Sequence, residues 1–238
     1  MSAKVALEDL KRFSRSKRVN DLARFYKTAP GEYGEGDLFL GGSVPETRSV
    51  AKRHKNLELQ EIEKLFKSPF HEARLCAAII INLQFKAAKK TQERKRIFDF
   101  YLKQVRAERV NNWDIVDVSA PWMGVYLSEV EDPMPLLIKL SKSKSLWQRR
   151  VSIMLTFALI RDGNLEPTII ISKALLADDE DLIHKAVGWM LRELGKKDVM
   201  LLRKFLTQHS HIMPRTMLRY SIEKLPERER KKWLAERK

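Results

Sequence analysis

Two tryptophans, an aspartate and two basic residues recur at spacings that bring them together in a regular helical array. Trp113 and Asp117 are four residues apart and therefore share one face of a helix. Arg149 follows Trp113 by 36 residues, and Trp189 follows Asp117 by twice that step, with Lys185 one turn before Trp189. A carboxylate beside indole rings can stabilise a positive charge through direct electrostatics and cation–π attraction. These five residues are the first candidates for a ligand-facing surface.

Each of these residues also has an ordinary structural explanation. A tryptophan at helical spacing usually packs in a core, and an aspartate near an arginine usually forms a solvated ion pair that contributes little. The combination favours a ligand surface, because facing positions in a helical array are normally aliphatic. Two indoles, an acid and two cations in one register have no evident packing purpose.

The spacing of apolar residues predicts the helices that must position this set. Apolar side chains recur at intervals of three and four almost to the end of the chain, and alternating strand patterns are absent. SVPE at 43–46 fits a capping box, and prolines, including Pro121, are expected in first turns. The expected helices span 3–14, 18–28, 45–54, 58–67, 69–87, 91–107, 112–130, 133–142, 145–161, 167–177, 180–195, 197–208, 214–225 and 227–237.

The second half of the chain contains an internal repeat. Laying SLWQRRVSIML (145–155) over DLIHKAVGWML (181–191) superposes Arg149 on Lys185 and Val151 on Val187 at an offset of 36 residues. A helical unit of this length is typical of an α-solenoid. We therefore expect an all-α fold with a single domain over 1–238. It would be a right-handed superhelix of HEAT-like helical pairs with a basic concave face.

The charge of the chain indicates its partners. Lys plus Arg number 46 against 31 Asp plus Glu, a formal net charge of +15, so the surface should attract polyanions. Nucleic acid is the first expectation and an anionic membrane surface the second. The lone Cys76 suits a reducing compartment, and no apolar run is long enough for a secretion signal or a membrane span. We expect a soluble, intracellular protein.

No metal or cofactor is expected from the sequence. The five histidines accompany no cysteine cluster and no HExxH motif, so they predict no zinc site. The GEYGEGD stretch lacks the flanking strand features of a nucleotide-binding loop and reads as a flexible loop.

Four segments of the chain resemble one known family. NNWDIVD (111–117), LWQRR (146–150) and KAVGWMLRELGKKD (185–198), with LFLGGSVPETR (38–48) upstream, are similar to the bacterial AlkD family of alkylpurine DNA glycosylases, which are HEAT-like repeat proteins. The similarity runs from about residue 20 to about residue 225. It places Trp113, Asp117 and Trp189 on the family's active-site aromatic, carboxylate and aromatic positions. Arg149 falls on a basic position beside the lesion, and Phe25 falls near a further aromatic that is often tyrosine.

The resemblance implies a monofunctional enzyme. It would hydrolyse the N-glycosidic bond of cationic N3- and N7-alkylated purines in duplex DNA and leave an abasic site. An alkylated purine that is already cationic departs as a neutral base, so a single carboxylate at Asp117 should suffice, without a general acid. Neutral lesions should be poor substrates. The resemblance also implies that the damaged base stays stacked.

The expected partner is double-stranded DNA that contains alkylated purines. The protein would be a monomer in the bacterial cytoplasm, associated with the nucleoid, without a membrane or metal partner. The residues expected to contact DNA are Phe25, Arg48, Arg150, Lys185, Arg192 and Arg215. The alternative is a HEAT-like scaffold that binds DNA or protein without chemistry. Asp117 separates the two hypotheses, because a pure phosphate binder should avoid a carboxylate there.

Overall fold

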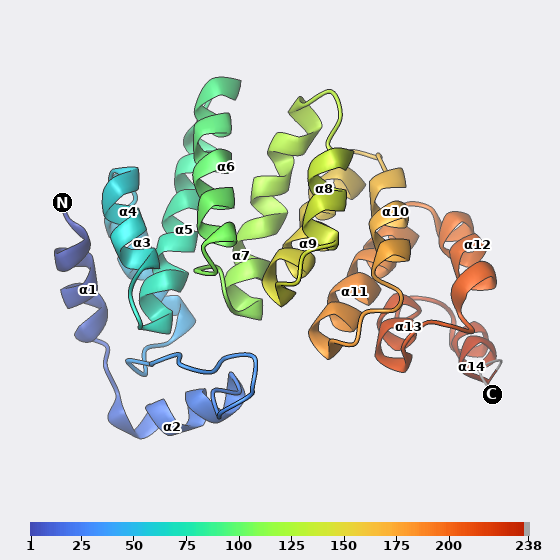
Figure 1. Cartoon of the computed structure of the whole chain (residues 1–238), viewed down its shortest axis with the longest axis horizontal. Helices are drawn as coiled ribbons and strands as arrows, with labels where there is room; N and C mark the ends of the chain where they lie inside the picture. The colour runs from blue at the N-terminus through green and yellow to red at the C-terminus, as the bar shows by residue number, and fades with distance from the viewer. Residues whose placement is uncertain (236–238) are drawn as a thin grey trace. The chain divides into compact units, whose positions relative to one another are not determined.

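The computed structural model describes residues 1–235, whose regular elements are helices (Figure 1). One isolated bridge between Leu38 and Phe70 is the only strand-like pairing in that range. The helices of these residues are α1 (Ala3–Lys11), α2 (Ser16–Phe25), α3 (Val44–Arg53), α4 (Leu59–Phe66), α5 (His71–Ala87), α6 (Thr91–Arg106), α7 (Trp113–Met123), α8 (Met134–Ser141), α9 (Leu146–Arg161), α10 (Glu166–Ala174), α11 (Asp181–Lys197), α12 (Val199–His209), α13 (Arg215–Ser221) and α14 (Glu227–Ala235). Each lies within a few residues of an expected helix. The last expected range, 227–237, extends beyond the described residues.

The segment expected as one helix over 112–130 is divided. It forms α7 and then a 3-10 helix, η1 (Gly124–Glu129). The prediction that Pro121 starts a helix is wrong, because Pro121 lies inside α7. A proline within a helix removes one backbone hydrogen bond and crowds the preceding turn, so α7 ends soon after it. Gly124 follows, where a side chain would lie only 2.2 Å from the carbonyl oxygen of Leu155.

The chain divides into two compact units, residues 1–123 and residues 124 onward. In the first unit, α3, α5 and α7 pack in sequence, α4 and α6 cover α5, and α1 packs against α3 and α4 (Figure 1). In the second unit, α9, α11 and α13 pack in sequence, and α8, α10 and α12 form the second layer. Each unit is thus a stack of paired helices. The single domain over 1–238 stays a prediction.

Hydrogen bonds within each unit agree with the repeat of 36 residues. The Asn82 side chain on α5 donates to the carbonyl of Val118 on α7. In the second unit, the Lys197 ammonium at the end of α11 donates to the carbonyl of Arg161 at the end of α9. Both pairs are 36 residues apart. Equivalent positions of successive repeats are therefore lateral neighbours inside each unit.

The first unit is built around α5, which is buried at every position from His71 to Asn82. A helix that is covered all round belongs to the centre of a domain. Its neighbour α3 begins with the predicted capping box: the Ser43 hydroxyl accepts from the Glu46 N–H, and the Glu46 carboxylate accepts from the Ser43 N–H. Arg15 donates to the same carboxylate with two nitrogens, and these bonds lower the pKa of Glu46. The cap therefore also ties the segment before α2 to the start of α3.

Within residues 1–235, no helix is both long enough and apolar enough to cross a membrane.

Candidate functional site

Trp113 and Asp117 lie one turn apart on α7, and both are partly exposed. The Asn112 side-chain oxygen accepts from the Trp113 N–H at 2.9 Å, directly at the start of α7. Burial, together with the nearby negative charge of Asp117, raises the pKa of Tyr101, whose side chain is fully buried. The Asp117 carboxylate therefore lies at the boundary between the core of the first unit and solvent.

Aromatic rings surround Trp113. Its indole stacks on the Tyr26 ring at a centroid distance of 5.6 Å and meets the Phe25 ring edge-on at 5.8 Å. Tyr26 in turn stacks on Phe39 at 5.3 Å. Phe25 is 61% exposed, whereas Tyr26 and Phe39 are each 6% exposed. The predicted residues Phe25 and Trp113 thus present neighbouring rings at the surface, on a buried aromatic support that the sequence analysis did not identify.

A buried polar network lies directly behind these rings. The Tyr26 hydroxyl donates to Asp114 at 3.0 Å, and the His71 ring bridges Asp114 at 2.9 Å and Asp37 at 3.4 Å. The Asp37 carboxylate also accepts from the buried guanidinium of Arg74. Burial alone would lower the pKa of His71, but the two carboxylates outweigh it and raise that pKa to about 9. His71 is therefore a cation at neutral pH.

The sequence gives little sign of this network, because its members come from four separate segments of the chain. Asp37 lies in the stretch that reads as a flexible loop. The stretch is a loop, but it is anchored: Asp37 is buried, and the buried Glu72 carboxylate accepts from the N–H groups of Leu40 and Gly41. Gly41 has a φ of +89°, and any side chain there would meet the Arg15 backbone. One sequence feature could have indicated this network: the HExR pattern at 71–74 places charged residues at the start of an otherwise apolar helix.

The second unit holds Trp189, which is partly exposed on α11. Its indole N–H donates to Glu193 at 3.2 Å, and its ring lies 6.4 Å from that of Phe157 on α9. Gly188 precedes it and allows α13 to approach closely: a side chain at this position would lie 2.5 Å from the Cβ of Tyr220. The place of Trp189 is thus fixed by tight packing of α11 on α13.

Arg149 on α9 is engaged within the second unit. Its guanidinium donates to the Asp178 carboxylate at 2.6 Å and to the backbone carbonyls of Ser143 and Lys144. The side chain is only 17% exposed. Asp178 neutralises the Arg149 guanidinium, which was expected to lie beside the lesion. That role stays a prediction, and it requires Arg149 to contact DNA while bound to Asp178 or to leave Asp178 for DNA.

The other expected DNA contacts differ in their surroundings. Arg150 is 4% exposed and donates to the carbonyl of Leu182, so it is placed to support the packing of α9 on α11. Lys185 pairs with Asp181 at 2.7 Å, and Arg192 pairs with Glu223 and Glu193.

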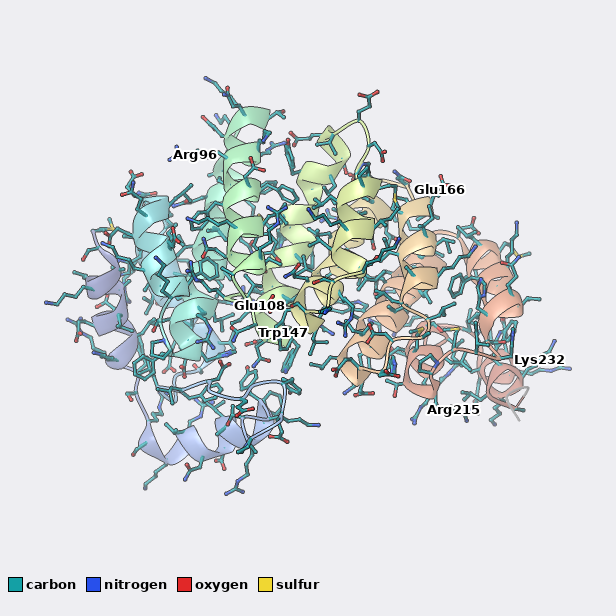
Figure 2. All side chains as sticks on the ribbon, viewed as in Figure 1. Arg96, Glu108, Trp147, Glu166, Arg215 and Lys232 are labelled. Atoms are coloured by element: carbon teal, nitrogen blue, oxygen red, sulfur yellow. The ribbon has the colours of Figure 1, made fainter. Side chains whose placement is uncertain are left out.

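Two of the expected contacts keep an exposed guanidinium. Arg48 is exposed on α3. Arg215, labelled in Figure 2, is exposed at the start of α13 and donates to the carbonyl of Leu234 at 2.8 Å. They are thus the exposed members among the cations expected to contact DNA.

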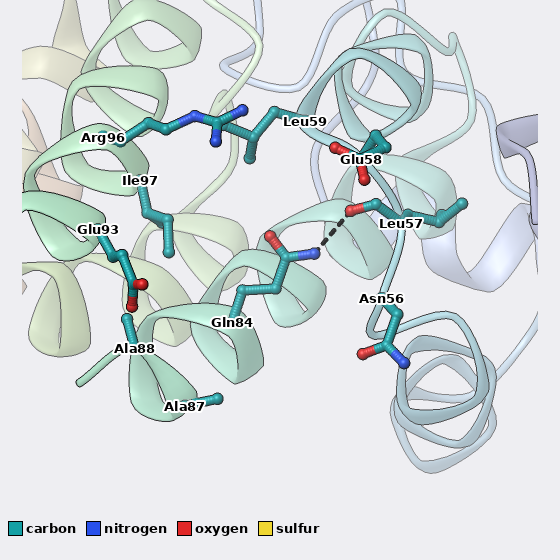
Figure 3. Close-up of a pocket in the computed structure, with 10 residues that line it drawn as sticks. All are labelled: Asn56, Leu57, Glu58, Leu59, Gln84, Ala87, Ala88, Glu93, Arg96 and Ile97. Carbon is teal, nitrogen blue, oxygen red and sulfur yellow. Dashed lines mark hydrogen bonds between the residues drawn. The ribbon is translucent and has the colours of Figure 1, made fainter. Parts of the chain in front are cut away.

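A pocket of about 480 Å³ lies elsewhere in the first unit, among α4, α5 and α6 (Figure 3). Its Gln84 side chain donates to the carbonyls of Lys55 and Leu57. None of the site residues expected from the sequence lines it. Within the part of the chain that the structure describes, no group of three or more histidine, cysteine or acidic residues is arranged to hold a metal ion.

Comparisons with known proteins bear on fold and family. The model of a family described as "DNA alkylation repair enzyme" matches residues 6–225. A solved structure, described as a predicted DNA alkylation repair enzyme from Enterococcus faecalis, superposes with a TM-score of 0.68. It is 18% identical, and the match covers 90% of this chain and 97% of that chain.

A second solved structure gives a TM-score of 0.54 at 13% identity, covering 93% of this chain and 83% of that one. It belongs to a family described as related to the HEAT-like repeat DNA glycosylases, with affinity for branched DNA structures. A comparison with curated proteins gives no match. The fold is thus an all-α solenoid of HEAT-like helical pairs, as the sequence predicts.

Proposed function

The chain belongs to the family of DNA alkylation repair enzymes, and from this premise we propose that it is a monofunctional DNA glycosylase. It hydrolyses the N-glycosidic bond of cationic N3- and N7-alkylated purines in duplex DNA and leaves an abasic site. The observation that carries the proposal is the pair on α7: a partly exposed carboxylate, Asp117, one turn from a partly exposed indole, Trp113.

The chemistry of the bond explains why this pair suits the reaction. Cleavage develops positive charge on the deoxyribose, and a carboxylate at van der Waals distance stabilises that charge in the transition state. An indole face adds cation–π attraction of about 0.5–2 kcal/mol, depending on how far water is excluded. Asp117 also orients or deprotonates the attacking water. The cationic base leaves neutral, so the reaction needs no acid beside it.

The remaining contacts in the proposal are assigned from the sequence register. Trp189 supplies the second indole and Arg149 a cation beside the lesion. Phe25 adds an exposed ring next to Trp113. Arg48 and Arg215 contact phosphates, and the net charge of +15 favours binding of the DNA polyanion.

Asp117→Asn is the decisive variant, because it removes the charge and keeps the shape. We expect wild type to release 7-methylguanine from duplex DNA, and Asp117→Asn to lose at least about 100-fold in single-turnover rate, the scale of losing one electrostatic group in a reaction centre. Asp99→Asn is the matched control. The Asp99 side chain is 56% exposed on α6 of the same unit and pairs with Lys95, and its loss should leave the rate unchanged. Equal rates for Asp117→Asn and wild type would refute the catalytic role.

A scaffold that binds DNA without chemistry is the second candidate. It is favoured by the engagement of Arg149 with Asp178 and by the affinity for branched DNA ascribed to the second structural neighbour. This function predicts salt-sensitive binding of undamaged or branched DNA, because phosphate contacts release counterions. It also predicts that no base is released from any alkylated duplex. The base-release assay therefore separates the two functions directly.

A further inference from the structure

The buried network of the first unit supports a column of stacked rings. Tyr26 lies between Trp113, at 5.6 Å with an interplanar angle of 23°, and Phe39, at 5.3 Å with an angle of 18°. The His71 ring contacts two members of this column, at 4.5 Å from Tyr26 and 5.1 Å from Phe39. The plane of the Trp113 indole is thus set by Tyr26, which itself stacks on Phe39.

His71 links the column of rings to two carboxylates, Asp114 and Asp37. One ring nitrogen meets Asp114, which also accepts the Tyr26 hydroxyl, and the other meets Asp37, two residues before Phe39. Only an imidazolium donates from both nitrogens, because a neutral ring carries a single N–H. If the ring loses its proton, one of two buried carboxylates faces a lone pair. Either loss weakens one of the two supports of Tyr26. Asp37 keeps its bonds from Arg74, Asn111 and Asn112, so the contact with Asp114 at 2.9 Å is the one that depends most on His71.

The charges around His71 come from every described element packed against it. Asp114 lies on α7, Asp37 on the loop before α3, and Arg74 and Glu72 on α5. Tyr26, after α2, completes the shell as a neutral donor, because burial and the Asp114 charge raise the pKa of its hydroxyl. Glu72 follows His71 in the chain and acts on Tyr26 and Arg74. With it, the cluster holds three carboxylates, one guanidinium and the imidazolium, so protonation of His71 leaves these five ionised groups with a net charge of −1.

We propose that His71 is a positioning residue for base excision: as an imidazolium it holds Asp114 and Asp37, and through them the Tyr26–Phe39 support that orients the Trp113 indole toward the DNA sugar. The inference rests on the proposed function, because Trp113 matters to chemistry only if the sugar cation forms against it. It predicts that the excision rate depends on a proton that never contacts the DNA.

His71→Gln tests the proposal, with His54→Gln as the matched control. His54 is also buried in the first unit and pairs with one carboxylate, Asp9, which lies on α1, away from the aromatic column. We expect His71→Gln to lower the single-turnover rate on 7-methylguanine duplex within the range of about 2- to 30-fold set by loss of the Trp113 indole itself, because His71 acts only through that ring. The affinity for the duplex should change less than twofold. His54→Gln should keep the wild-type rate even if it lowers the unfolding temperature as much as His71→Gln does.

The pH profile distinguishes positioning from simple destabilisation. The ratio of the wild-type rate to the His71→Gln rate cancels any pH dependence of the substrate. It should be constant from pH 7 to 8 and fall toward one above about pH 9, where His71 loses its proton. A ratio that stays constant to pH 10, or a rate loss equal in His54→Gln, would overturn the proposal.

A measurement without catalysis keeps the test independent of the proposed function. The indole N–H resonance of Trp113, assigned with Trp113→Phe, should move between pH 8 and 10 in wild type and stay fixed in His71→Gln. If wild type releases no alkylated base, the proposed function fails and this resonance shows whether His71 still orients the indole. If the resonance does not move in wild type, the positioning role is refuted whether or not base is released.

Discussion

The close packing of α11 on α13 makes Gly188→Ala a sharp test of how the second unit is built. A methyl group at this position would lie 2.5 Å from the Cβ of Tyr220 and 2.6 Å from the carbonyl oxygen of Met217. Neither atom can rotate away, because one is backbone and the other is the first side-chain carbon. Restoring ordinary contact at about 3.4 Å requires the two helices to separate by roughly 0.9 Å, in a region where Val187 and Met217 are fully buried.

The expected free energy combines two opposing effects. Alanine gains about 1 kcal/mol over glycine in helix propensity, whereas overpacking a tight core costs about 1–3 kcal/mol and more where backbone must move. Because both contacts are with atoms that cannot rotate away, the overpacking cost should lie in the upper part of this range, at about 2–3 kcal/mol, and the net loss should be about 1–2 kcal/mol. Each kcal/mol lowers the melting temperature of a chain of this size by about 2–4 °C. Calorimetric unfolding of Gly188→Ala and wild type measures the difference.

Gly195→Ala provides the control on the same helix. Its methyl group would approach Cδ2 of Leu202 at 2.4 Å, but the Cβ and Cγ of that side chain stay at 3.4 Å, so a change of rotamer relieves the contact. Gly195→Ala should therefore unfold at or above the wild-type temperature. If Gly188→Ala proved as stable as Gly195→Ala, the close approach of α11 and α13 would not be the reason for a glycine at 188.

Three further predictions concern the stability that His71 provides, the arginines expected to contact DNA, and the Trp113 indole. Folding raises the pKa of His71 from 6.5 to about 9, so protonated His71 stabilises the folded state by on the order of 3 kcal/mol. This stabilisation is complete below pH 6.5 and is lost as the pH rises to about 9. The free energy of unfolding, measured in urea at pH 6 and pH 9.5, should therefore fall in wild type by more than in His71→Gln. Arg48→Ala should reduce the salt slope of duplex binding by about 1, whereas Arg150→Ala should lower the unfolding free energy and leave that slope unchanged, because Arg150 is buried. A slope change in Arg150→Ala would show that its guanidinium reaches DNA. Trp113→Ala should slow base release about 2- to 30-fold, the equivalent of one cation–π contact, and an unchanged single-turnover rate would exclude that contact.

The helices of this protein are largely a local property of its sequence. Apolar spacing, the Ser43–Glu46 cap and the repeat of 36 residues predict every helix within a few positions, because these signals act within a turn or a helix pair. The exception is the division of 112–130 near Pro121. There a proline that resembles a helix start sits inside α7, and the close approach of the Leu155 backbone at Gly124 accompanies the change to a 3-10 helix. That contact joins residues too distant in sequence for any local pattern to show.

The candidate site divides in the same way. Spacing alone places Trp113 and Asp117 on one face of one helix, and the structure leaves both partly exposed there. Whether a charge reaches solvent is decided by partners far along the chain. Asp178 binds Arg149 across 29 residues, and Asp114 binds Tyr26 across 88.

Sequence periodicity therefore determined which side chains share a face of a helix. Only tertiary packing decided which of them are neutralised, buried or stacked, because burial and ion pairing depend on segments that the chain brings together only when it folds.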